Sequence, residues 1–94
     1  MKDIEEIIKI LYEIRSIVDS NQTDVGWSKY NSVQKVLSEI DTHINKLKNN
    51  DLSNLYELEI LFGPTGSFQE ISISSGWEDK YINISSRFNK AIGK

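Results

Sequence analysis

The sequence predicts a small α+β domain, in which two antiparallel N-terminal helices are followed by a β-hairpin and a C-terminal helix. Apolar residues recur at steps of three and four over much of the N-terminal half, which is the spacing of amphipathic helices. A turn-forming block at 63–66, Gly-Pro-Thr-Gly, separates two stretches with alternating apolar residues, as in paired strands. The pattern Ser-Gly-Trp-Glu at 75–78 then predicts a helix start.

The length and composition indicate one folded unit. A chain of 94 residues is long enough for one domain, so we expect a single α+β domain over residues 1–94. Hydrophobic residues make up 38% of the chain and charged residues 27%, a balance typical of soluble proteins with a packed core. No internal repeat or low-complexity segment interrupts it.

Two helices are expected in the first half of the chain. The first spans about 3–19, with Asp3 and Glu6 as an N-cap pair, and its wide apolar face predicts a central position or a dimer contact. The polar segment 20–26 would connect it to a second helix at about 27–48. The apolar residues of the second helix form a single seam, as in an antiparallel helix pair: Tyr30, Val33, Leu37, Ile40, Ile44 and Leu47.

The hairpin is predicted from strands at about 57–62 and 67–74. In its loop, Gly63 and Gly66 would be free to adopt positive φ, and Pro64 would fix its own φ. This register places Glu59 opposite Glu70. One face of the hairpin then has an apolar centre with an acidic surround, made of Glu57, Glu59, Leu61, Phe68 and Glu70.

The last helix is expected at about 76–92. Ser75 and Glu78 would form a capping box, and the core face would follow at helical spacing. That face consists of Trp77, Tyr81, Ile84, Phe88 and Ala91.

Charge and residue types narrow the function. The net charge of −3 argues against nucleic acid and favours a basic partner. The absence of cysteine excludes disulfides and thiolate sites and predicts a cytoplasmic location. The N-terminus is acidic where a signal peptide is basic, and no apolar run has the length of a membrane span, so we expect no membrane contact.

Few residues are candidates for catalysis. Glu59 and Glu70 could act as a paired acid and base, but a hairpin beside three helices offers little cleft depth. His43 is the only histidine and is expected at the edge of the second helix's apolar stripe, without partners for a triad or metal site. The Gly63–Gly66 loop lacks the Gly-Lys-Ser/Thr end of a P-loop. We therefore expect a non-enzymatic protein that needs no cofactor or metal.

The block at 61–77, Leu-Phe-Gly-Pro-Thr-Gly-Ser-Phe-Gln-Glu-Ile-Ser-Ile-Ser-Ser-Gly-Trp, resembles the signature of a family of short uncharacterised bacterial proteins. The resemblance covers the Pro-Thr-Gly turn, the Gln-Glu-Ile-Ser-Ile-Ser segment and the Gly-Trp helix start, and it implies no functional residue. The small size and acidity of the chain are also similar to those of immunity proteins that neutralise bacterial toxins.

Protein binding is the function that these observations favour. A basic partner protein could bind the hairpin face that consists of Glu57, Glu59, Leu61, Phe68 and Glu70. Its apolar side chains would supply affinity, and its carboxylates would select for a basic surface. Immunity-type neutralisation of a toxin is one role of this kind. The alternative is a self-associating structural or scaffold protein, in which the same apolar residues close a homodimer.

Overall fold

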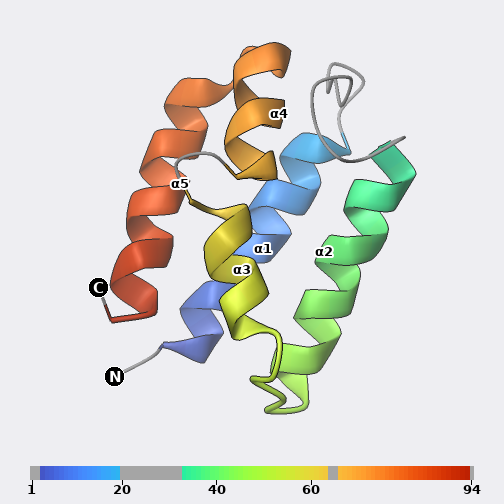
Figure 1. Cartoon of the computed structure of the whole chain (residues 1–94), viewed down its shortest axis with the longest axis vertical. Coiled ribbons are helices and arrows are strands. Elements are labelled where there is room, and N and C mark those ends of the chain that lie inside the picture. The colour runs from blue at the N-terminus through green and yellow to red at the C-terminus, as the bar shows by residue number, and fades with distance from the viewer. Residues whose placement is uncertain (1–2, 20–32, 64–65, 94) are drawn as a thin grey trace.

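The computed structural model describes residues 3–19, 33–63 and 66–93, and its regular structure is entirely helical (Figure 1). Five α-helices lie in these residues: α1 (Ile4–Val18), α2 (Val33–Lys48), α3 (Leu55–Leu61), α4 (Ser67–Ser75) and α5 (Glu78–Ala91). No strand occurs in the described ranges, so the predicted α+β class is wrong. The expected connection at 20–26 and the expected start of the second helix at about 27 lie outside them.

α1 lies between α2 and α5 and packs against both (Figure 1). The Asp3 carboxylate caps it, because one carboxylate oxygen accepts a hydrogen bond from the backbone N–H of Glu6 at 3.1 Å. The reciprocal half of the predicted pair does not form, since the Glu6 carboxylate pairs with Arg87 and the Asp3 N–H donates to Ala91. Its buried side consists of Ile7, Ile10, Leu11, Ile14 and Val18. This broad apolar face contacts two neighbouring helices, which explains its width.

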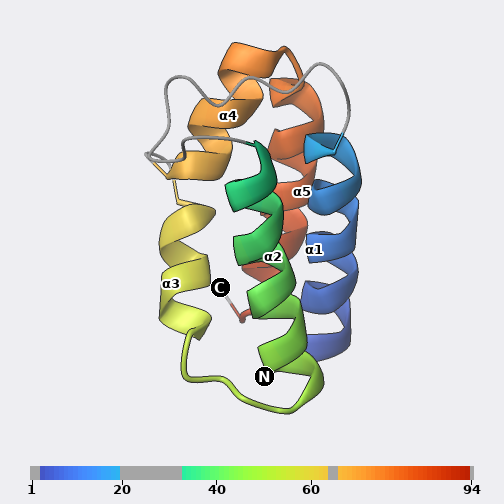
Figure 2. The ribbon, with the colours of Figure 1, turned by 90° about the vertical axis from the view of Figure 1, so that its right-hand side faces the viewer.

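α2 runs antiparallel to α1 and packs along it (Figure 2). A partly exposed hydrogen bond joins the two helices, since Nε of Arg15 on α1 donates to a carboxylate oxygen of Asp41 on α2 at 2.7 Å. On the buried side of α2 lie Val36, Leu37, Ile40, His43, Ile44 and Leu47.

α3 and α4 replace the predicted hairpin, so the strands expected at about 57–62 and 67–74 and their register are wrong. Leu55, Leu58 and Leu61 recur every three residues and are all buried, which is a helical period. Ile60 is 54% exposed, although strand alternation placed it on the same face as Leu58. Burial therefore follows the helical spacing and not the alternation.

The same spacing governs α4. Phe68, Ile71 and Ser72 are buried at i, i+3 and i+4, and Ile73 is exposed. Gly66 stands at the N-cap with φ −77° and ψ 166°, so the positive φ expected of it in a hairpin turn is wrong. Pro64 and Thr65 of the predicted loop lie outside the described residues.

A glycine C-cap joins α4 to α5. Gly76 ends α4 with φ 82°, and the backbone N–H of Trp77 donates to the Ser72 carbonyl at 2.9 Å. Ser75 is the last residue of α4, and Trp77 occupies the N-cap position of α5 without a side-chain cap bond. The predicted capping box of Ser75 and Glu78 is therefore wrong, because the glycine ends one helix just before the next begins.

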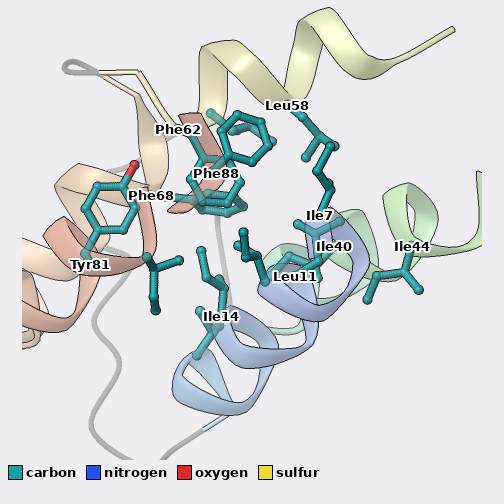
Figure 3. Packing of buried hydrophobic residues seen from close by; sticks show 14 of the residues in the cluster. Ile7, Leu11, Ile14, Ile40, Ile44, Leu58, Phe62, Phe68, Tyr81 and Phe88 are labelled. Atoms are coloured by element: carbon teal, nitrogen blue, oxygen red, sulfur yellow. The ribbon is translucent and has the colours of Figure 1, made fainter. Parts of the chain in front are cut away.

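An aromatic cluster fills the core between α3, α4 and α5 (Figure 3). The ring of Phe62 stacks on Phe88 with centroids 4.0 Å apart and meets Phe68 edge-on at 5.0 Å. Tyr81 lies parallel to Phe62 at 6.2 Å. These rings pack against the aliphatic residues of α1, so α3 and α4 are anchored mainly by side chains.

The two ends of the described chain are tied together. The backbone N–H of Asp3 donates to the carbonyl of Ala91 at 2.6 Å. Arg87 of α5 pairs with two carboxylates of α1, Glu13 at 2.7 Å and Glu6 at 3.2 Å. α1 and α5 are therefore joined by both backbone and charged contacts.

Candidate functional site

The structure separates the five residues that the sequence assigned to one binding face. Leu61 and Phe68 are 3% and 1% exposed and belong to the core, so they do not form an exposed apolar centre. Glu57 and Glu70 are exposed, and Glu59 is partly exposed. Glu57 and Glu59 face different clefts, on opposite sides of α3. The predicted set therefore does not come together, because α3 and α4 are helices and not paired strands.

A cleft of about 540 Å³ lies between α3 and α5, next to the start of α4. α5 and its C-cap Ile92 provide most of its wall, and the residues of α5 that line it are Glu78, Tyr81, Ile82, Ser85, Phe88 and Asn89. The opposite wall comes from Glu59, Phe62 and Gly63, and α4 adds Gln69. The volume falls in the range typical of binding sites.

The cleft exists because the backbones of α3 and α5 are not closely packed against each other. Among the described helices, α3 makes close backbone contact with α4, whereas α5 is closely packed on α1 and α4. Large rings fill the space behind α3, and Phe62, Tyr81 and Phe88 form an aromatic floor. The floor is therefore made largely of apolar ring atoms.

The charge of the cleft has one sign. Glu59 and Glu78 are the charged residues that line it in the described chain, and they stand on opposite walls. Ile82 is 58% exposed on the α5 side. On α3, Tyr56 is also exposed and lies three residues before Glu59, so the two are neighbours on the helix surface. Acidic groups are thus mixed with exposed apolar side chains.

One polar atom beside the cleft has no partner within the described chain. The Tyr81 hydroxyl is buried and makes no hydrogen bond. Burial raises the pKa of this phenol well above its ordinary value, so the group is neutral at physiological pH. A buried, unpaired hydroxyl destabilises the fold.

A shallower cleft lies on the other side of α3 and contains His43. The imidazole is 3% exposed, and His43 is therefore a core residue and not the boundary residue that we expected. Its Nε2 lies 3.8 Å from a carboxylate oxygen of Glu39, but burial outweighs this carboxylate and lowers the pKa of the imidazole. In the described residues, no three His, Asp or Glu side chains are grouped as metal ligands.

A further cleft, of about 570 Å³, lies where α1 meets the α4–α5 junction. Its charged lining residues are Asp79 and Lys80, which have opposite signs. It offers no single charge preference, so we take the α3–α5 cleft as the candidate site.

Part of this site could have been found in the sequence. Glu59 was in the predicted set, but Glu78 was assigned to a helix cap and Ile82 was in no predicted site. Glu78, Ile82, Ser85 and Asn89 recur at steps of four, three and four beside the core stripe of α5. An isoleucine that lies outside the core stripe, within this second and otherwise polar stripe, is the sequence signal that was missed.

Comparisons of the chain with protein-family models, curated proteins and solved structures found no match. The resemblance of the 61–77 block and the likeness to immunity proteins therefore stay predictions. None of the helices in the described ranges combines the length and the apolar character that crossing a membrane requires.

Proposed function

We propose that this chain is a small non-enzymatic protein that binds a basic partner protein through the α3–α5 cleft. The observation that carries the proposal is that two carboxylates, Glu59 and Glu78, line the same cleft as the exposed side chain of Ile82. Apolar contact supplies affinity, and the carboxylates favour partners with lysine or arginine at the contact. The net charge of −3 attracts such partners before contact.

The cellular role belongs to the proposal as well. A chain without cysteine suits the reducing cytoplasm, and its size and acidity resemble those of toxin-neutralising immunity proteins. A basic toxin is accordingly the first class of partner to test.

The test is a comparison of three forms of the full chain in affinity capture from the source cells. The cleft variant carries Ile82→Asp, and the control carries Leu52→Asp, which adds the same charge at an exposed apolar residue that does not line the cleft. We expect a basic protein to be retained by the wild type and the control and lost by the cleft variant. Equal retention by all three folded forms would contradict the proposal.

Self-association is the second candidate, and one observation favours it. Tyr56 is 72% exposed, and Ile60, Ile73 and Ile82 are exposed on the neighbouring helices α3, α4 and α5. Such side chains could be covered by a second copy. Sedimentation equilibrium tests this candidate: a dimer that Ile60→Asp converts to a monomer would support it, and a wild-type monomer at high concentration would exclude it.

A further inference from the structure

We infer that the occupant of the α3–α5 cleft is a basic amphipathic helix of the partner. This inference rests on the proposed function and adds the form of the bound segment. It follows from the length of the cleft, the nature of its walls and the arrangement of its charges.

The cleft extends along α5 from end to end. Its lining residues begin at Glu78, the first residue of α5, continue through Ser85, and end at Ile92 just beyond the helix. At ~1.5 Å per residue, the 14 residues of α5 span roughly 21 Å. A partner helix of about four turns matches this length.

The walls favour a helical ligand over an extended one. α3 and α5 bond their backbone groups internally, and in the described ranges there is no strand edge to which a peptide could add. An extended segment would lose water from its own N–H and C=O groups without replacing those hydrogen bonds. A helix satisfies these groups itself and presents only side chains to the cleft.

The side chains along the cleft specify the pattern of that helix. Ile82 and the aromatic floor of the cleft favour apolar residues at i, i+3 or i+4 on the facing side of the bound helix. Glu59 and Glu78 call for lysine or arginine flanking that apolar stripe. An acidic amphipathic helix would bring like charges together and is disfavoured.

The experiment compares labelled peptides of about 16 residues, a length that slightly exceeds that of α5. The first has leucines at helical spacing, flanked by lysines. The second keeps every leucine and lysine but has prolines at two central positions on the polar face, which break the helix. Fluorescence anisotropy measures their binding to the full chain, and circular dichroism follows helix formation in the complex.

We expect the helical peptide to bind at least tenfold more tightly than the proline peptide and to gain helix content on binding. Ile82→Asp should weaken this binding about tenfold or more, and the matched control Leu52→Asp should leave it unchanged. A version of the helical peptide with glutamate in place of lysine should not bind.

Equal binding of the helical and proline peptides would overturn the helix inference and leave the basic-partner proposal standing. Binding of neither peptide would also overturn the inference, and the capture experiment would then decide the proposed function separately. Binding that Ile82→Asp does not affect would mean that the peptide does not occupy the cleft.

Discussion

At the scale of single residues, Gly66 shows how little space remains where α3 meets α4. Its backbone is extended, so alanine could adopt the same φ and ψ. However, a Cβ at this position would lie 2.8 Å from the carbonyl carbon of Leu61 and in closer contact with the carbonyl oxygens of Ile60 and Leu61. The constraint is steric and comes from neighbouring backbone.

Gly66→Ala should therefore destabilise the protein by about 1–3 kcal/mol, because the backbone must shift to admit the methyl group. Urea unfolding measures the difference. Ser67→Ala, at the next position, is the control and should change the free energy of unfolding little. An unfolding midpoint for Gly66→Ala equal to that of the wild type would show that α4 does not approach α3 in this way.

The buried Tyr81 hydroxyl gives a prediction of the opposite sign. Since this group has no partner within the described residues, Tyr81→Phe removes a desolvated polar atom and keeps the ring packing. We expect the free energy of unfolding to rise by about 1 kcal/mol. Tyr56→Phe, at an exposed tyrosine, should have no effect. A loss of stability in Tyr81→Phe would mean that the hydroxyl is hydrogen-bonded.

His43 makes stability depend on pH. Burial lowers its pKa in the folded state, whereas the unfolded chain protonates it near the ordinary value of 6.5. The unfolded state thus gains the proton first, so stability should be constant above about pH 7 and fall as the pH is lowered through 6.5. Glu13 and Asp51, whose pKa values are lowered by hydrogen bonds from Arg87 and Ser53, lose their contribution only in more acidic solution.

Urea unfolding at pH 7.5 and pH 5.5 checks this prediction. His43→Gln removes the titrating group, so its stability should change less between these two values than that of the wild type. Parallel changes in both proteins would exclude His43 as the source of the pH dependence.

At the scale of elements, the long helices were predictable and the short ones were not. α1, α2 and α5 repeat their apolar residues over several turns, so the helical period can be distinguished from the two-residue alternation of a strand. α3 has seven residues and α4 has nine, and over that length both periods match the apolar residues. The β-branched Ile71 and Ile73, which alternate with serines, favoured a strand, but packing against α5 overrides this weak preference.

Two substitutions on α3 distinguish its helix from the predicted strand. Leu61 is buried, so Leu61→Ala should lower the free energy of unfolding by about 3 kcal/mol. Ile60 is exposed, so Ile60→Ala should change it by about 0.5 kcal/mol or less. Urea unfolding measures both. The opposite order would restore the strand, in which Ile60 shares the apolar face with Leu58.

At the scale of the whole molecule, the candidate site depends on the arrangement of helices that the sequence did not predict. A hairpin would have put Leu61 and Phe68 at the surface, whereas the bundle buries both and opens a cleft between α3 and α5 instead. Glu59 belongs to both the predicted face and the cleft. The residue that faces it across the cleft is Glu78 of α5, whereas the predicted hairpin placed Glu70 opposite it. The sequence could not show this, because the tertiary fold decides which helix lies opposite α3.

The most direct measurement is an NMR titration of the ¹⁵N-labelled full chain with the helical lysine–leucine peptide. If the cleft is the binding site, the largest amide shifts should lie along one side of α5, at Ile82, Ser85 and Asn89, and at Glu59 on the facing wall. Ile82→Asp should abolish them, and Leu52→Asp should not. Shifts confined to the outer surfaces of α1 and α2 would contradict the account.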